Sequence, residues 1–167
     1  MKYLYYPGCS LEGTSVEYNI STKLLMEAVD VQLEEIEDWN CCGATAAESN
    51  SQLLSYVLPA RNLALAEKMK SSKQILVPCS ACYLNLKKTE EIIKKDKNLL
   101  GKINTVLAEE DLVLKGDVIV RHLLDVLSKD VDIEKVKENA QNKMAGLTIV
   151  PYYGCQCLRP FSVFDDP

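Results

Sequence analysis

The sequence predicts an α/β domain with a mainly parallel sheet and flanking helices. Short segments rich in β-branched and aromatic residues alternate with longer helical patterns, an order typical of strands joined by helical crossovers. The 167 residues and the hydrophobic content of 47% are enough for one compact domain with its own core. In sheets of this class, ligand sites lie at the carboxyl ends of the strands.

The first part of the chain contains two candidate strands with a helix between them. The strands are KYLYYPGC from Lys2 and VQLEEIEDW at 31–39. Between them, Thr14 and Glu17 stand at the spacing of a capping box, which predicts the start of a helix. That helix carries apolar side chains on one face, at Val16, Ile20, Leu24 and Ala28.

Helical patterns dominate the middle of the chain. A helix is expected just after Cys42, with Pro59 dividing it, because proline disrupts a helix interior but suits a first turn. A third strand, QILVPCS, begins at Gln74. From about Ser80 a long helix is predicted, with a break near Gly101. Two further helical stretches lie at 118–130 and 133–144.

The end of the chain repeats a pattern from its beginning. The segment TIVPYYGCQCLR within the strand-like run from Leu147 resembles the opening KYLYYPGCSLEG, and the two glycine-cysteine pairs place Cys9 and Cys155 146 positions apart. We therefore expect 1–146 to form one domain and 147–167 to begin a second, similar one. Chance similarity over so few residues is the alternative.

Charge and hydropathy exclude several functional classes. The net charge is −5 and the pI about 5.0, with no strongly basic block, which argues against nucleic acid as the partner. The N-terminal residues lack the pattern of a secretory signal, and no apolar run of about 18 residues is present to span a bilayer. We expect a cytoplasmic protein without direct membrane insertion.

The cysteines are the residues most indicative of function. Five of the seven form the pattern C-x31-CC-x36-CxxC, at Cys9, Cys41, Cys42, Cys79 and Cys82. Adjacent cysteines rarely bridge each other, because their α-carbons are about 3.8 Å apart and a disulfide needs about 4.4–6.8 Å. Each of the five follows a predicted strand, so one end of the sheet is expected to gather them. Such clustering indicates metal binding or redox chemistry. For Cys157, a small buried apolar role is the alternative.

The arrangement GC...CCG...PCSAC resembles the CCG cysteine-rich domain found in the B-type subunit of heterodisulfide reductase. The strings YYPGCSLEGT, CCGATAAES, LPARNLALA and YYGCQCLRP are also similar to that protein, so the resemblance covers essentially the whole chain. It implies a Rossmann-like CCG domain whose Cys9, Cys41, Cys42, Cys79 and Cys82 hold a noncubane 4Fe-4S cluster. It also implies Cys155 as a ligand at a second site. An aerobically prepared sample is expected to lose the cluster or carry zinc instead.

The resemblance further implies an oxidoreductase subunit that cleaves a disulfide reductively, with the heterodisulfide of coenzyme M and coenzyme B as the substrate in methanogenesis. Its partners would be iron–sulfur and flavin subunits of a heterodisulfide-reductase-type complex and a thiol or disulfide substrate. The 167 residues alone are expected to be inactive, because the resemblance implies a substrate that lies between the clusters of two CCG domains. They are also expected to self-associate as a homo-oligomer, because the surface for a second domain is exposed.

Two other readings of the cysteines stay open. One is an electron-relay or assembly module of a succinate, lactate or glycolate dehydrogenase, since these enzymes use similar domains. The other is a structural zinc domain, although zinc sites are normally closed by four ligands and the pattern offers five. His122, the sole histidine, is the candidate proton donor for product thiolates, with a packing or capping role as the alternative.

Overall fold

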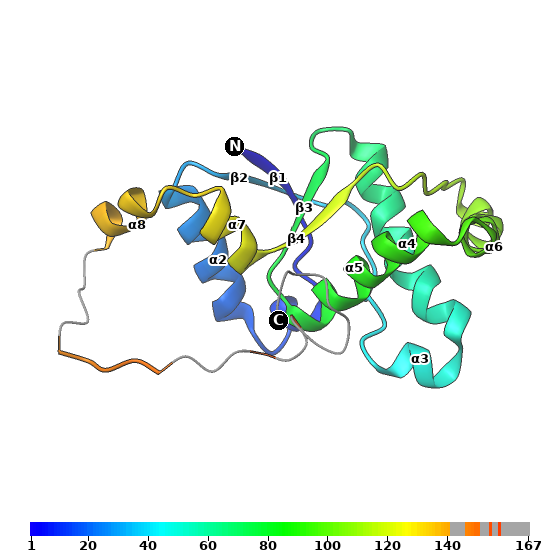
Figure 1. Ribbon diagram of the computed structural model, residues 1–167, viewed down its shortest axis with the longest axis horizontal. Coiled ribbons are helices and arrows are strands. Elements are labelled where there is room, and N and C mark those ends of the chain that lie inside the picture. The colour runs from blue at the N-terminus through cyan, green and yellow to red at the C-terminus, as the bar shows by residue number, and fades with distance from the viewer. Residues whose placement is uncertain (141–145, 151–153, 155–156, 158–167) are drawn as a thin grey trace.

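Four parallel strands form one sheet in the order β2-β1-β3-β4 in the described part of the molecule (Figure 1). The computed structural model describes residues 1–140, 146–150, 154 and 157. The strands are β1 (Lys2–Tyr5), β2 (Gln32–Glu35), β3 (Gln74–Val77) and β4 (Ile119–His122). In the register, Leu4 lies opposite both Glu34 and Ile75, and Val77 lies opposite His122. The predicted α/β class with a parallel sheet is confirmed.

Helices cover both faces of the sheet. They are α1 (Cys9–Glu12), α2 (Val16–Ala28), α3 (Ala46–Asn50), α4 (Gln52–Met69), α5 (Ser80–Lys95), α6 (Lys97–Leu107), α7 (Leu123–Lys129) and α8 (Ile133–Asn139), with a 3-10 turn at Ala108–Glu110. In Figure 1, α2 and α7 lie on one side of the sheet and α4, α5 and α6 on the other.

The alternation of side chains along β1 divides the core into two halves. Tyr3 and Tyr5 pack in a cluster with residues of α2 and α7, whereas Leu4 and Tyr6 pack in a cluster with residues of α4 and α5. All four side chains are at most 2% exposed. A strand buried on both faces is typical of a parallel sheet covered by helices, and this burial anchors the loop that follows β1.

The region predicted as a helix at 118–130 begins as a strand. Residues Ile119–His122 form β4, and only Leu123–Lys129 are helical. The strand pairs with β3, so the β-branched run Val118–Val120 is stabilised by a neighbour 45 positions earlier, Gln74 opposite Ile119. Periodicity alone does not reveal such a partner. His122 ends the strand and caps α7 through its side chain.

Two predicted helix breaks are misplaced. Pro59 lies inside α4, and the break falls instead at Ser51, whose hydroxyl accepts a hydrogen bond from the Leu54 amide at 3.4 Å. Likewise Gly101 lies inside α6, and Asp96 separates α5 from α6 by accepting from the Leu99 amide at 2.9 Å. In both cases a side-chain cap decides the boundary.

The helix α2 turns its predicted apolar face outward. Val16, Ile20 and Leu24 are exposed, while Thr22 and Met26 are the buried positions. The predicted capping box also does not form: Ser15 precedes the helix, and no side chain caps its first turn. The packing of α2 on the sheet, rather than its own apolar pattern, sets its orientation.

The predicted strand from Leu147 is not formed in the part that the structure describes. Residues 147–150 are assigned to no strand, and Leu147, Ile149 and Val150 are exposed. Residues 151–153 and Cys155 lie outside the described residues. The second domain at 147–167 therefore stays a prediction. Within the described chain, no helix combines the length and apolar character needed to cross a membrane.

Candidate metal centre

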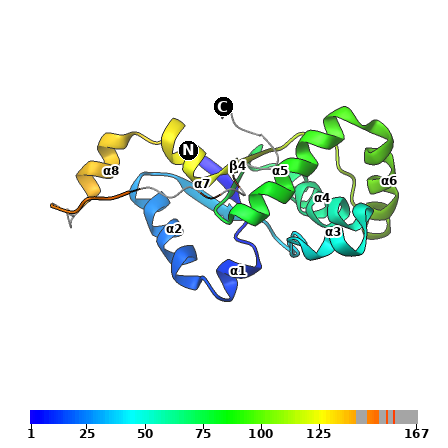
Figure 2. The same cartoon turned by 60° about the horizontal axis from the view of Figure 1, so that its bottom comes forward.

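The topology of the sheet gathers the five cysteines of the motif at one end. Cys9 follows β1, Cys41 and Cys42 follow β2, and Cys79 and Cys82 follow β3, so the thiols extend from the carboxyl ends of three adjacent strands. Figure 2 shows α1 and α3, which flank this end, in the lower part of the view. The predicted convergence at the strand ends is thus observed.

The sulfurs lie in contact across these segments. Cys9 Sγ is 3.6 Å from Cys41 Sγ, and Cys42 Sγ is 3.4 Å from Cys82 Sγ. Cys42 and Cys82 are buried, whereas Cys9 and Cys41 are exposed. Cys79 is the N-cap of α5 and lies 3.7 Å from Ser10 Oγ. The site therefore has a buried side and a side open to solvent.

Hydrogen bonds among the thiols change their acidity. Side-chain hydrogen bonding with Cys82 is the main reason that the pKa of Cys79 falls to about 5 and that of Cys42 to about 7. The same contacts with Cys42 and Cys79 raise the pKa of Cys82 itself, and burial adds to that rise. The amides of Ala81 and Cys82 also lower the pKa of Cys79, as expected at a helix N-terminus. Two of the five sulfurs are thus predisposed to the thiolate form that binds metals.

Side-chain amides hold the loop with the two adjacent cysteines. The fully buried Asn62 of α4 accepts from the Asn40 amide and donates to the Asn40 carbonyl, both at 2.9 Å. The Tyr6 hydroxyl also donates to that carbonyl, at 2.7 Å, and its ring packs edge-on against half-buried Trp39. On the other side, Asn85 of α5 donates to the loop.

Sequence reasoning missed Asn62 and Asn85 as site residues. The signal for Asn85 was its position three residues after Cys82 on a helix, which places both on one face. For Asn62, nothing in the surrounding sequence LPARNLALA indicates that its partner is Asn40, 22 positions away. Only the packing of α4 against the loop reveals that contact.

His122 and Cys157 lie together beside the same end of the sheet. His122 is only 4% exposed, and its Nδ1 accepts from the Leu124 amide at 3.2 Å. Its Nε2 faces Cys157 Sγ at 3.6 Å, and Cys157 Sγ is 3.2 Å from Ser80 Oγ. Cys157 is half-buried, and its polar neighbours distinguish it from a purely apolar filler.

The donor set fits an iron–sulfur cluster. Thiolate is the usual protein ligand of such clusters, and five thiols converge here, two with lowered pKa values. Among residues 1–140, 146–150, 154 and 157, no three His, Cys, Asp or Glu side chains stand in an arrangement that would itself hold a metal ion. The sulfur separations of 3.4 and 3.6 Å are hydrogen-bonding contacts between side chains, and metal binding would displace any proton held on these sulfurs.

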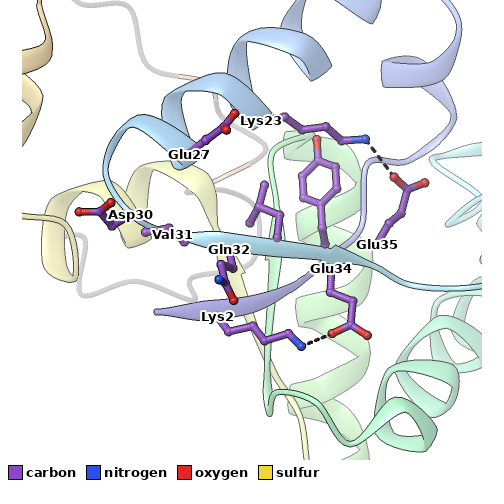
Figure 3. Close-up of a pocket in the computed structure, with 10 residues that line it drawn as sticks. Lys2, Lys23, Glu27, Asp30, Val31, Gln32, Glu34 and Glu35 are labelled. Atoms are coloured by element: carbon purple, nitrogen blue, oxygen red, sulfur yellow. Dashed lines mark hydrogen bonds and ion pairs between the residues drawn. The ribbon is translucent and has the colours of Figure 1, made fainter.

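A hollow in the described part of the molecule lies away from the cysteines. It measures about 800 Å³ and runs along β2 and the end of α2 (Figure 3). Ion pairs cross its rim, Lys2 with Glu34 at 2.6 Å and Lys23 with Glu35 at 3.1 Å. No cysteine lines it, so its location does not identify the reactive part of the molecule.

Comparisons with known proteins agree with the site. Residues 3–87 match the family described as CCG, cysteine-rich domain. The chain is 35% identical, over 95% of its length and 54% of the relative, to the 8-methylmenaquinol:fumarate reductase membrane anchor subunit of Wolinella succinogenes. It is 26% identical to an Archaeoglobus profundus protein described as like the B-type subunit of heterodisulfide reductase, over 99% of this chain and 55% of the relative. It is also 25% identical to the B-type subunit of the ferredoxin:CoB-CoM heterodisulfide reductase of Methanosarcina mazei, over 92% of this chain and 50% of the relative.

The chain spans about half the length of these relatives. Among solved structures, a hypothetical protein from Helicobacter pylori is similar with a TM-score of 0.64 and 18% identity, over 77% of this chain and 25% of that one. At this identity the likeness supports the fold alone.

Proposed function

Because the chain belongs to the CCG cysteine-rich domain family, we propose that it is an iron–sulfur subunit of a heterodisulfide-reductase-like complex. Its cofactor would be a noncubane 4Fe-4S cluster on Cys9, Cys41, Cys42, Cys79 and Cys82, and its reaction the reductive cleavage of a disulfide of the coenzyme M–coenzyme B type. The single observation that carries the proposal is the convergence of five thiols from three strand ends.

The number of thiols favours this cofactor over simpler ones. A structural zinc site closes with four ligands, and an ordinary cubane cluster also uses four cysteines. The contact of Cys42 with Cys82 at 3.4 Å and of Cys9 with Cys41 at 3.6 Å brings both members of the adjacent pair into the site. When bound, the cluster would supply electrons one at a time for the two-electron cleavage of an S–S bond.

Different residues of the chain would enclose the cluster, leave one side open to substrate and stabilise negative charge. The buried pair Cys42 and Cys82 forms the enclosed side of the site, where solvent is excluded. Cys9 and Cys41 are exposed and mark the side from which a disulfide could approach. The positive end of α5 faces Cys79 and stabilises negative charge there.

His122 is the proposed proton donor for product thiolates. It ends β4, and so lies at the same end of the sheet as the cysteines. Since its Nδ1 accepts from the Leu124 amide, the neutral ring carries its proton on Nε2, the atom that faces Cys157. Burial lowers the pKa of His122. At neutral pH the residue therefore offers a hydrogen bond, and its capacity to transfer a proton grows as the pH falls.

The partners follow from the same proposal. The relatives are named as subunits of larger reductases, so this chain would work with iron–sulfur and flavin subunits that deliver electrons. A second candidate function is an electron-relay or assembly module of another dehydrogenase, which the similarity to a fumarate reductase subunit favours. The two differ in whether a thiol acts on the cluster directly.

The test is a metal analysis combined with spectroscopy. Iron, acid-labile sulfide and zinc are measured per chain on full-length protein purified without oxygen, and electron paramagnetic resonance spectra are recorded after oxidation with and without coenzyme M. About four irons with a spectrum altered by the thiol support the disulfide reductase. About four irons with an unaltered spectrum favour the relay, and one zinc without sulfide overturns the iron–sulfur proposal.

Matched cysteine variants assign the ligands. Cys41→Ser removes a thiol of the five-cysteine motif and should lower iron content and change the spectrum. Cys157→Ser removes a half-buried thiol outside the motif and should leave the iron content unchanged. Equal iron content in both variants would contradict the proposed ligand set.

A further inference from the structure

We propose that Asn85 is a positioning residue that donates a hydrogen bond to the Cys42 sulfur and thereby raises the reduction potential of the cluster. The inference rests on the proposed iron–sulfur function and deepens it. Asn85 belongs to α5, the helix that also carries Cys82 and is capped by Cys79. One helix thus brings two thiols and a hydrogen-bond donor to the site.

Three acceptors surround the Asn85 amide nitrogen. Asn85 Nδ2 lies 2.8 Å from the Ala44 carbonyl, 3.3 Å from the Cys42 carbonyl and 3.7 Å from Cys42 Sγ. The amide has two hydrogens. One serves Ala44, and the other is shared between the carbonyl and the sulfur of Cys42. Asn85 therefore joins the helix to the loop that carries the adjacent cysteines.

The loop needs such a clamp because its backbone is strained. Gly43 has φ +85°, and the following residue, Ala44, has φ +42° although it has a side chain. A non-glycine residue in the left-handed region costs roughly 1–3 kcal/mol and persists only where its surroundings hold it. The bond from Asn85 to the Ala44 carbonyl supplies that restraint, so Asn85 directs the Cys42 sulfur toward Cys82.

The bond to sulfur has an electrostatic consequence. A donor aimed at a metal-bound thiolate stabilises negative charge on the sulfur, and reduction adds negative charge to the cluster. The reduced form therefore gains more from Asn85 than the oxidised form. Without the donor, the midpoint potential should become more negative.

Asn104 provides a matched control. It clamps a loop in the same way, donating from Nδ2 to the Leu114 carbonyl at 3.0 Å and accepting from the Leu114 amide at 2.8 Å. Its contacts include no cysteine. Asn85→Asp and Asn104→Asp both keep the shape of the side chain and remove its donors, so both lose a loop clamp and only the first loses a donor to sulfur.

The first measurement is the midpoint potential of the reconstituted full-length protein. Asn85→Ala and Asn85→Asp should shift it to more negative values, with the larger shift for aspartate because a carboxylate adds negative charge. Asn104→Asp should match the parent protein. Unchanged potentials in both Asn85 variants, at equal iron content, would overturn the proposal. If Asn85→Asp fails to fold, the neutral Asn85→Ala decides.

A second measurement needs no cluster. In urea unfolding of the metal-free protein, a double-mutant cycle combines Asn85→Ala with Cys42→Ala, which removes the sulfur but keeps both loop carbonyls. The two changes should be non-additive, whereas Asn104→Ala and Cys42→Ala should be additive. Additivity in the first cycle overturns the contact. If the parent protein binds no iron, the proposed function fails while this cycle still tests the contact.

Discussion

Gly8 approaches Cys82 so closely that a β-carbon at Gly8 would lie 2.6 Å from the Cys82 sulfur. The same glycine has φ +76°, in the region that side chains disfavour. The loop between β1 and Cys9 therefore passes directly against the CxxC segment, although the two are more than 70 positions apart in the sequence. This contact accounts for the glycine that precedes the first cysteine of the motif.

Gly8→Ala should damage both stability and metal binding. The positive φ costs about 1–2 kcal/mol for alanine, and the displaced Cys82 sulfur moves away from Cys42. We expect the free energy of unfolding to fall by about 2 kcal/mol or more and most of the bound iron to be lost. Urea unfolding and iron analysis measure the two effects.

Gly101→Ala is the control for Gly8→Ala. Gly101 lies inside α6, and a β-carbon there meets nothing within 4 Å. Alanine in a helix interior is favoured over glycine by about 0.5–1 kcal/mol, so this variant should be slightly more stable with unchanged iron. A stability loss in Gly101→Ala equal to that in Gly8→Ala would show that the contact with Cys82 is not responsible.

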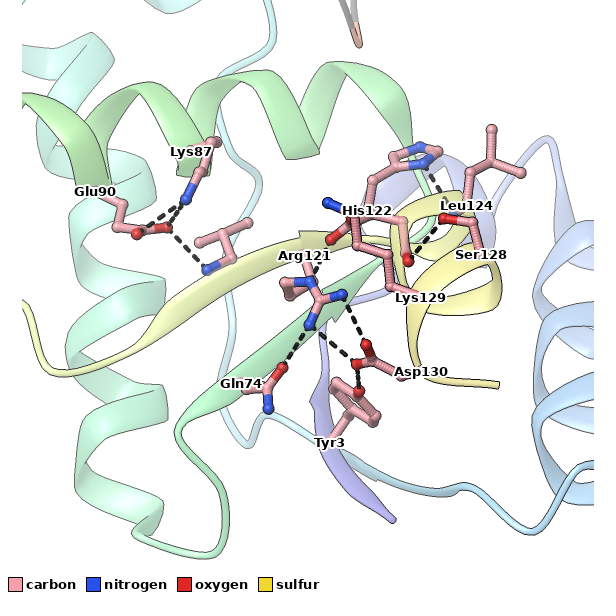
Figure 4. Close-up of polar contacts among 12 residues, drawn as sticks. Tyr3, Gln74, Lys87, Glu90, Arg121, His122, Leu124, Ser128, Lys129 and Asp130 are labelled. Atoms are coloured by element: carbon pink, nitrogen blue, oxygen red, sulfur yellow. Dashed lines mark hydrogen bonds and ion pairs between the residues drawn. The ribbon is translucent and has the colours of Figure 1, made fainter. Parts of the chain in front are cut away.

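Glu90→Ala should destabilise the protein by about 3 kcal/mol, because it removes a buried charged acceptor. The Glu90 side chain is 1% exposed and accepts from the Val120 amide of β4 at 2.8 Å, while Lys87 pairs with the same carboxylate (Figure 4). Alanine would leave the Val120 amide without this acceptor. Urea unfolding measures the loss. Glu134→Ala, which breaks an exposed pair with Lys137, should change stability by less than about 0.5 kcal/mol, and equal losses would contradict the prediction.

Arg121 should stabilise the protein more at neutral pH than in acid. Burial raises the pKa of both Asp125 and Asp130, but hydrogen bonds lower each pKa by more, so both values lie below their usual range. The donors are Lys129 and Arg121 at Asp125, and Arg121 and Tyr3 at Asp130. Figure 4 shows Arg121 between Asp130 and Gln74. Since the unfolded carboxyls titrate near pH 4, this stability is present above about pH 4 and lost as the pH falls through the folded values.

Arg121→Met tests that linkage. The variant should lose about 3 kcal/mol at pH 7, and the difference from the parent protein should shrink below about pH 4. Urea unfolding from pH 7 to pH 2.5 measures it. A difference that stays constant across this range would show that the carboxylates do not depend on Arg121.

His122 should make the protein less stable as the pH falls below about 6.5. Burial lowers its pKa, so the unfolded state binds a proton before the folded state does, and unfolding is favoured between the two pKa values. His122→Asn keeps a side-chain acceptor for the Leu124 amide and removes the titration. Its stability should therefore fall less steeply than that of the parent protein between pH 6.5 and pH 5. If stability fell equally steeply with pH in the variant and in the parent protein, protonation of His122 would not be the cause.

Sequence reasoning recovered the elements whose signals are local. The β-rich segments at Lys2, 31–39 and Gln74 are strands, and the cysteines behind them meet because parallel strands end at the same edge of a sheet. The same reasoning misplaced the helix breaks at Pro59 and Gly101. The helices begin instead at the caps Ser51 and Asp96, where one side-chain hydrogen bond to the backbone outweighs the helix-breaking tendency of proline or glycine.

What the sequence by itself determined is the chemistry: the parallel α/β class and five thiols at strand ends, since residue type and spacing carry both. Only the tertiary structure decided how these thiols are held. Asn62 clasps Asn40 from 22 positions away, Asn85 reaches Cys42 from 43, and Ile119 finds its strand partner at Gln74. Each of these contacts depends on a backbone group that folding brings near. The residue type at one position does not indicate which distant backbone group will be its partner.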